Sequence, residues 1–296
     1  MALVRPLRFI VSHPLNRGRE LQSVLRFIKW QLGSRLRGGA AIVNWIGGSR
    51  FLVRTGEKGI TGNIYTGLQE FEDMGYLLHV LRDSDLFVDV GANVGSYTVL
   101  ACAAVGASGF AFEPVPTTYN RLVENVRLNR MEARVTCLNV GVGDAEYTTR
   151  FTSALDVTNH VAITGEDDSN TIDVRICTLD AVLKHSAPSL AKIDVEGFEL
   201  PVLEGAQEIL KKESLHSVIM ELNGSGTHYG YDESRIMQMM LDHGFHSYSY
   251  DPFKRKLIDL GGKTVPYGNT IFVRNLTLVK DRIASAGKVR VNGKEF

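Results

Sequence analysis

The chain has 296 residues, which is enough for one large domain or for one domain with an added segment. Its 33 basic and 33 acidic residues give a formal net charge of zero, so no overall positive field favours nucleic acid as a partner. Three cysteines (Cys102, Cys137 and Cys177) show no paired spacing. We therefore expect thiols in a reducing compartment, and a cytoplasmic protein, rather than disulfides or a zinc site.

The first 48 residues form a basic extension in our interpretation, partly helical. Residues 1–37 carry eight Arg and Lys residues against one acid, Glu20. Apolar residues recur there at helical spacing: Leu21, Val24, Leu25, Ile28 and Leu32. A helix packed on the main domain explains this pattern. The alternative is a basic amphipathic segment in residues 1–37 that makes peripheral contact with an anionic membrane.

From residue 86 onward, apolar runs of strand length alternate with helical patterns. Strands are predicted at 86–90, 109–113, 134–142, 191–195, 217–222, 247–250, 256–260 and 270–273. Helices are predicted at 97–104, at 117–129, from Glu199 through Leu210, and at 236–243, while 147–178 predicts a hairpin around an acidic loop at 165–170. This alternation indicates an α/β fold with a doubly wound, mainly parallel sheet. Residues 276–296 are expected to be a loosely held C-terminal tail.

The stretch LFVDVGANVGSYTVLACA (86–103) combines a buried strand, a polar glycine loop and the start of a helix. Asp89, Gly91, Asn93 and Gly95 would lie beyond the carboxyl end of the first core strand, where doubly wound sheets bind ligands. Glu113 ends the second strand, where a carboxylate can accept hydrogen bonds from a ribose diol. The glycine spacing does not match the nicotinamide fingerprint. Together these residues predict an adenosine-type site.

A second group of acids follows a later strand, in AKIDVEGFEL (191–200), and places Asp194, Glu196 and Glu199 close together. Glu221 ends the next strand at the same sheet edge. Neighbouring carboxylates raise one another's proton affinity, which suits a general base. They could instead hold a divalent cation. For Glu199 a simpler role is the start of a helix.

These motifs together resemble the FkbM-type family of S-adenosylmethionine-dependent methyltransferases. The matching blocks are FVDVGANVGSYT (87–98), FEP (112–114), NVGVGD (139–144), TLD (178–180), KIDVEGFELPVLEGA (192–206) and MELN (220–223). The resemblance covers about residues 50–275, and we place the methyltransferase domain at 49–275. It implies a class I (Rossmann-like) methyltransferase fold with an antiparallel last strand.

The resemblance also implies O-methylation of a sugar, a polysaccharide precursor or a similar hydroxyl-bearing metabolite. It places residues around S-adenosylmethionine as follows: Asp89, Gly91, Asn93 and Gly95 at the methionine, Glu113 at the ribose, Asp144 near the adenine, and Asp194 and Glu196 at the transfer site. Apart from the resemblance, we expect contacts with the acceptor from the N-terminal region and from the loops at 154–170 and 223–232. An NAD-dependent oxidoreductase or a non-catalytic nucleotide-binding module is the alternative, and the oligomeric state stays open.

Overall fold

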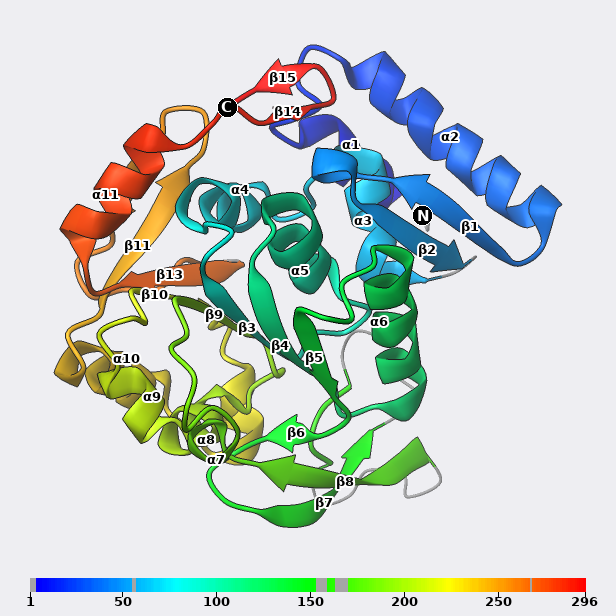
Figure 1. Cartoon of the computed structure of the whole chain (residues 1–296). Helices are drawn as coiled ribbons and strands as arrows, with labels where there is room; N and C mark the ends of the chain where they lie inside the picture. Colours follow the sequence, from blue (N-terminus) through cyan, green and yellow to red (C-terminus); the bar gives the residue numbers. More distant parts are fainter. Residues whose placement is uncertain (1–3, 55–56, 153–158, 163–169, 267) are drawn as a thin grey trace.

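The computed structural model describes residues 4–54, 57–152, 159–162, 170–266 and 268–296. Helices cover both faces of a large central sheet, and a smaller sheet lies at one end (Figure 1). Among the helices within these ranges, none combines the length and apolar character that crossing a bilayer requires.

The central sheet has eight strands and is mainly parallel, as predicted. β3, β4, β5, β9 and β10 are parallel, whereas β13 lies between β10 and β11 and is antiparallel to both. The last core strand is therefore the antiparallel one, as expected. In spatial order the strands are β12 (Lys256–Asp259), β11 (His246–Asp251), β13 (Asn269–Val273), β10 (Ser217–Glu221), β9 (Leu190–Ile193), β3 (Leu86–Val90), β4 (Ser108–Phe112) and β5 (Val135–Leu138).

The sheet is buried on both faces because its strands are apolar at successive positions. In β3, Phe87 belongs to the core on one face and Val88 to the core on the other, since neighbouring strand residues point in opposite directions. The Phe87 face packs against α4 (Phe71–Val80), α5 (Ser96–Val99) with its π-helical continuation (Leu100–Val105), α6 (Pro116–Leu128) and α11 (Leu276–Ser285). The Val88 face packs against α7 (Leu179–Val182), α8 (Glu199–Glu204), α9 (Gln207–Lys211) and α10 (Glu233–Asp242).

Two predicted elements are divided in the structure. The strand expected at 134–142 is β5 followed by β6 (Gly141–Val142), which joins a second sheet with β8 (Thr171–Cys177) and β7 (Tyr147–Thr152). Asn139 causes the break, because its side-chain amide donates to the carbonyl oxygens of Glu113 and Pro114, each at 2.9 Å, and turns the chain at the sheet edge. The expected hairpin is thus β7 and β8, and most of its acidic loop lies outside the described residues.

The helix expected to run unbroken to Leu210 is α8 and α9, separated at Gly205. The backbone of Gly205 packs directly against Gly143, and a Cβ atom at this position would lie 2.0 Å from the Gly143 carbonyl oxygen. The helix is therefore interrupted at the residue where its backbone contacts the segment that follows β6.

The N-terminal region forms a helical extension, as expected, but one expected contact is wrong. It contains α1 (Val4–Ser12), α2 (Glu20–Arg37), β1 (Ala40–Asn44), a 3₁₀ turn (Ile46–Gly48), β2 (Arg50–Arg54) and α3 (Lys58–Thr66). α2 packs on α1 and α3 through Ser23, Phe27 and Ser34, which are buried. Most of the apolar stripe that we expected to pack on the main domain is instead exposed.

The C-terminal residues are not the loosely held tail that we expected. Val279 and Ile283 of α11 are buried against α4, and Arg282 forms an ion pair with Asp85. The hairpin of β14 (Arg290–Val291) and β15 (Lys294–Glu295) leads to Phe296, which is 5% exposed. The sequence pattern is weak here because one short helix and two-residue strands leave few positions from which a period can be read.

Candidate active site

A cleft lies beyond the carboxyl ends of β3, β4, β9 and β10, at the point where the strand order reverses. Its β4 side is lined by Phe112, Glu113, Val140, Val142, Asn159 and Phe198, among others. Its β10 side is lined by Asn63, Glu70, Asp89, Tyr97, Lys192 and Glu221, among others. The two sides share Gly91, Asn93, Asp194 and Glu196. Most of the predicted site residues therefore lie together.

The glycine loop after β3 is shaped by contacts with two other strands. The amide nitrogens of Gly91 and Ala92 donate to the carbonyl oxygen of Phe112 in β4, at 3.1 and 2.9 Å. Gly91 has a φ of +78°, and a Cβ atom there would lie 1.9 Å from the backbone oxygen of Asp194. Position 91 therefore requires glycine because the loop after β9 lies too close for a side chain. This requirement holds whether or not a ligand approaches the backbone there.

Asp89 lies at the floor of the β10 side and is 2% exposed. One of its carboxylate oxygens accepts a hydrogen bond from the Thr98 hydroxyl at 2.5 Å. Burial raises the pKa of Asp89 to about 6, against the lowering effects of Thr98 and of the Lys192 charge. A cation placed at this floor would be stabilised by Asp89 and would lower its pKa.

Glu113 joins the end of β4 to the glycine loop. One carboxylate oxygen accepts from the Asn93 amide and the other from the Val115 amide, each at 2.9 Å. Burial nevertheless raises the pKa of Glu113 to about 7. Each oxygen retains an acceptor position, since a carboxylate has about four, and Glu113 lines the β4 side of the cleft.

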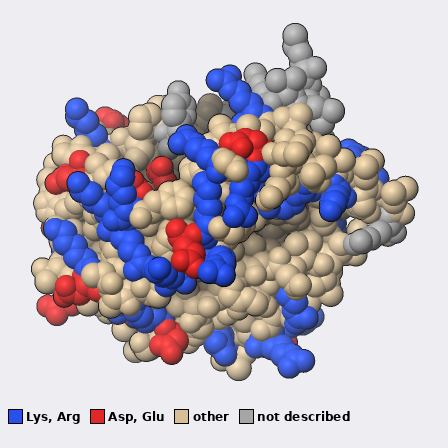
Figure 2. Space-filling model, turned by 90° about the horizontal axis from the view of Figure 1, so that it is seen from above, with Lys and Arg blue, Asp and Glu red and all other residues tan. Residues whose placement is uncertain are grey.

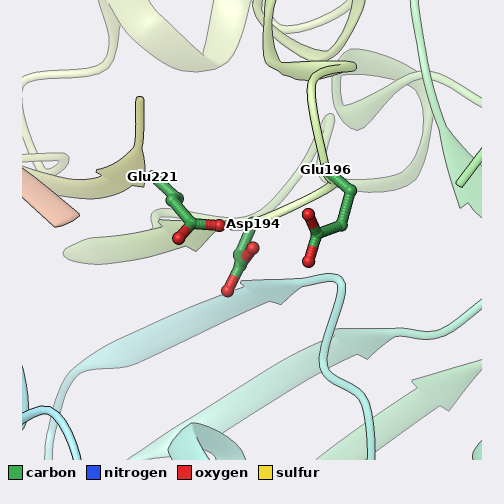
Figure 3. A group of neighbouring side chains, drawn as sticks. All are labelled: Asp194, Glu196 and Glu221. Carbon is green, nitrogen blue, oxygen red and sulfur yellow. The ribbon is translucent and has the colours of Figure 1, made fainter. Parts of the chain in front are cut away.

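Three carboxylates meet where the two sides of the cleft join. Asp194 and Glu196 follow β9, and Glu221 ends β10, and each offers an oxygen within 4.8 Å of the others (Figure 3). Glu196 adopts a left-handed backbone conformation (φ +55°) beside Gly197 (φ +100°), whose missing Cβ leaves room for the backbone of Ser225. The three oxygens could also hold a divalent cation through hard ligands.

Lys192 supplies the positive charge beside these acids, and its side chain is 3% exposed. Its Nζ donates to Asp194 Oδ2 at 2.7 Å and lies 5.0 Å from the centre of the Tyr97 ring. Burial opposes the charged form of Lys192, but the carboxylates of Asp194 and Glu70 raise its pKa above the usual value. The ammonium group is therefore kept charged inside the protein.

The charge of Lys192 separates the proton affinities of the three acids. Burial would raise the pKa of Asp194, but the Lys192 ammonium outweighs it and holds that pKa below the usual value. Burial and the Asp194 charge raise the pKa of Glu196 to about 7 and that of Glu221 to about 8. The pKa of Asp194 thus lies below those of Glu196 and Glu221, and the hydrogen bond between Asp194 and Glu221 favours the proton on Glu221.

A polar network of Tyr97, Glu70, Asp73 and Asn269 lies at the β10 side of the cleft. Tyr97 donates its hydroxyl proton to Glu70, and the Asn269 amide donates to Glu70 and Asp73 at 3.3 and 3.0 Å. Burial and the Glu70 charge raise the pKa of Asp73 to about 8. The wall of this side is therefore rich in groups that can hydrogen-bond a polyhydroxylated molecule.

Other predicted residues lie elsewhere. Asp144 is exposed and is not among the described residues that line the cleft, so its place near an adenine stays a prediction. Glu199 is buried and accepts from the amides of Val195 and Gly197, each at 3.2 Å, which agrees with the simpler role at a helix start. In the segment 223–232, which we expected to contact the acceptor, His228 is exposed in a 3₁₀ helix (Ser225–Tyr229).

Sequence reasoning missed Lys192, Glu70 and Asn63. A signal for Lys192 was present, because it is the only charged residue inside the apolar run LAKI. Glu70 and Asn63 precede the first core strand, and no local pattern places them at the cleft.

The sheet and its cleft define a class I methyltransferase fold, and comparisons with known proteins specify it further. Residues 89–247, more than half of the chain, match the family described as the methyltransferase FkbM domain, and the chain belongs to this family.

Two curated relatives agree with this assignment. The chain is 29% identical over 167 residues to the hexuronic acid methyltransferase AglP of Haloferax volcanii, covering 55% of this chain and 64% of the relative. It is 26% identical over 172 residues to the methyltransferase sdnD of Sordaria araneosa, covering 47% and 66%. The matches thus span just under two thirds of each relative.

Among solved structures, the chain is similar to a methyltransferase FkbM from Methylobacillus flagellatus, with 16% identity, a TM-score of 0.44, and coverage of 72% of this chain and 52% of that one. It is also similar to SMU.1697c of Streptococcus mutans, a putative methyltransferase in complex with SAH, with 11% identity, a TM-score of 0.41, and coverage of 68% and 95%.

Proposed function

We propose that this protein transfers a methyl group from S-adenosylmethionine to a hydroxyl oxygen of a sugar or a similar polyhydroxylated acceptor. The observation that carries the proposal is the division of the cleft into a mainly apolar side and a polar side that meet at Asp194 and Glu196. The relative named a hexuronic acid methyltransferase supports a sugar-like acceptor. The family match favours methyl transfer over the oxidoreductase alternative.

The residues on the β4 side fit the cofactor. The free lone pairs of Glu113 suit the two ribose hydroxyls, and the apolar wall of Val140, Val142 and Phe198 suits the flat face of an adenine. The methionine part would extend past Gly91 and Asn93, which both sides share, to the floor of the β10 side, where the Asp89 carboxylate would lie opposite its ammonium group. When bound, S-adenosylmethionine supplies an electrophilic methyl carbon on its sulfonium.

The β10 side would hold the acceptor and remove its proton. An alcohol has to lose its proton as the new carbon–oxygen bond forms, and Asp194 is the ionised base at the boundary of the two sides. Lys192 keeps Asp194 charged and fixes its position. The rest of the catalytic effect would come from holding the oxygen in line with the methyl carbon.

The test is a transfer assay with S-adenosylmethionine labelled in its methyl group, using glucuronic acid, a neutral hexose and oligosaccharides of both as acceptors. Mild alkali releases the label from a methyl ester but leaves a methyl ether intact, so alkali treatment of the product separates transfer to a carboxylate from transfer to a hydroxyl. We expect alkali-stable label. Label only in alkali-labile product, or only in RNA or peptide controls, would contradict the proposal.

The matched variant is Asp194→Asn, whose amide oxygen can still accept from Lys192. We expect transfer to fall by about 10²- to 10⁴-fold, the usual contribution of a general base. Binding of S-adenosylmethionine, measured by calorimetry, should change little. Transfer at the wild-type rate would remove Asp194 from the role of the base.

A further inference from the structure

Helix α2 has two apolar faces on opposite sides. Ser23, Phe27 and Ser34 form the buried face that packs on α1 and α3. At 100° per residue, the opposite face is formed by five residues that we call the outer stripe. These residues, with their exposed fractions, are Leu21 (73%), Leu25 (47%), Ile28 (43%), Leu32 (58%) and Leu36 (86%).

The outer stripe is large for an exposed apolar surface. From Leu21 to Leu36 it extends about 22 Å along the helix at 1.5 Å per residue. The outer stripe comprises five of the eleven large hydrophobic residues exposed in the described parts of the chain. Contiguous apolar surface of this kind marks an interaction site, whereas single exposed leucines are ordinary.

Basic side chains surround the outer stripe. Lys29 and Arg35 are exposed and lie on its two flanks, 60° from its centre on the helix, and the exposed Arg17 and Arg19 precede the helix. Glu20 is the only acid among residues 1–37. Figure 2 views the molecule from above and shows Lys and Arg side chains spread over that face, with fewer Asp and Glu among them. An apolar face with basic flanks is the signature of a helix that lies in the interface of an anionic bilayer.

We infer that the outer stripe of α2 binds the surface of a membrane that contains anionic lipids, with the leucines at the acyl boundary and Lys29 and Arg35 at the headgroups. Pairing with a second copy fits less well. A two-fold contact would place the basic flanks of one helix near those of the other, with Glu20 alone to compensate. The inference depends only on this surface and not on the chemistry proposed for the cleft.

The position of α2 connects this surface with the cleft through α3. Tyr65 of α3 packs against Phe27 of α2, with ring centroids 5.0 Å apart, while Asn63 of α3 lines the β10 side of the cleft. Docking through α2 would therefore hold the β10 side one helix away from the lipid surface.

The test is co-sedimentation of the full chain with vesicles of phosphatidylcholine alone and with vesicles that also contain phosphatidylglycerol. We expect binding to the anionic vesicles that weakens as salt is added, because salt screens the headgroup charge. Leu25→Ser with Leu32→Ser should weaken binding by about tenfold or more, since the leucines would enter the acyl boundary. The double variant Lys29→Glu with Arg35→Glu should bind anionic vesicles more weakly, by roughly fivefold for each basic residue lost.

Leu241→Ser is the control, because Leu241 is exposed to a similar extent (49%) but lies on α10. This variant should bind vesicles as the wild type does. All the changed side chains are exposed, so far-UV circular dichroism should show an unchanged fold. The inference is overturned if the wild type fails to bind anionic vesicles, or if the Leu25 and Leu32 double variant binds equally well. A dimer in light scattering that the double variant converts to monomer, without vesicle binding, would assign the outer stripe to self-association instead.

Discussion

Replacing Lys192 with methionine removes a buried positive charge while keeping most of the length of the side chain. In the wild type, the Lys192 ammonium lies 2.7 Å from Asp194 and near the carboxylates of Glu70 and Asp89. Lys192 is 3% exposed at its side chain and Asp194 is 31% exposed. The variant therefore leaves the Asp194 carboxylate among other acids and without its cationic partner.

The expected loss of stability is about 3 kcal/mol at pH 8, at the lower end of the range for breaking a buried pair because water still reaches Asp194. For a chain of this size that corresponds to a fall in Tm of about 6 °C. The folded-state pKa of Asp194 lies below its unfolded value in the wild type, so the pair stabilises the fold above the unfolded pKa. Without Lys192, burial and nearby acids raise the folded-state pKa of Asp194 instead, so the stability of the variant falls further as the pH rises.

The assay is denaturant unfolding of wild type and Lys192→Met at several pH values from 5 to 8. We expect the difference in unfolding free energy to widen as the pH rises. The double variant Lys192→Met with Asp194→Asn should recover much of the loss, because the unpaired charge is gone. A loss below about 1 kcal/mol, or a loss that does not depend on pH, would refute the assigned electrostatics.

Three further changes test the cleft. Glu113→Gln keeps the shape but removes the charge, so the dissociation constant of S-adenosylmethionine in calorimetry should rise about 10- to 100-fold; an unchanged constant would exclude the ribose role. Gly91→Ala should lower the unfolding free energy by at least about 3 kcal/mol, and Gly261→Ala should lower it by about 1 kcal/mol. Both glycines have a positive φ, but only at Gly91 would a Cβ meet a backbone atom. Equal losses of stability would contradict the packing argument. Because the pKa of Asp194 is already low, a rise of transfer with pH should follow the loss of protons from its neighbours Glu221 and Glu196, and Glu221→Gln should move that rise from about pH 8 toward pH 7, where Glu196 titrates. An unchanged profile would separate Glu221 from the reaction.

Much of the central sheet was predictable from local pattern. The strand at 86–90 was predicted with its observed bounds, and the glycine loop, Glu113 and the acids after β9 were expected at one sheet edge and lie there. The reason is topological, because parallel strands present their carboxyl ends at a common edge. Family membership confirms the methyltransferase resemblance, while the domain limits at 49–275 and the exclusion of nucleic acid stay predictions.

The parts that could not be predicted depend on contacts between distant segments. Gly91 is recognisable as a turn residue in sequence, but only the fold shows that the backbone of Asp194 excludes a side chain there. The ion pair of Lys192 with Asp194 looks local, yet its effect depends on burial beneath Tyr97 and Glu70, which come from other elements.

The sequence by itself determined the class of fold, the ligand edge and the chemical character of the acids, because strand and helix periods and motif spacing are written in neighbouring residues. Only the tertiary structure decided which face of α2 is buried, since either apolar face could have packed. It also decided the order of the pKa values of the three acids at the cleft. Asp194, Glu196 and Glu221 are alike as carboxylates, and their proton affinities differ because burial and a single lysine act on them unequally.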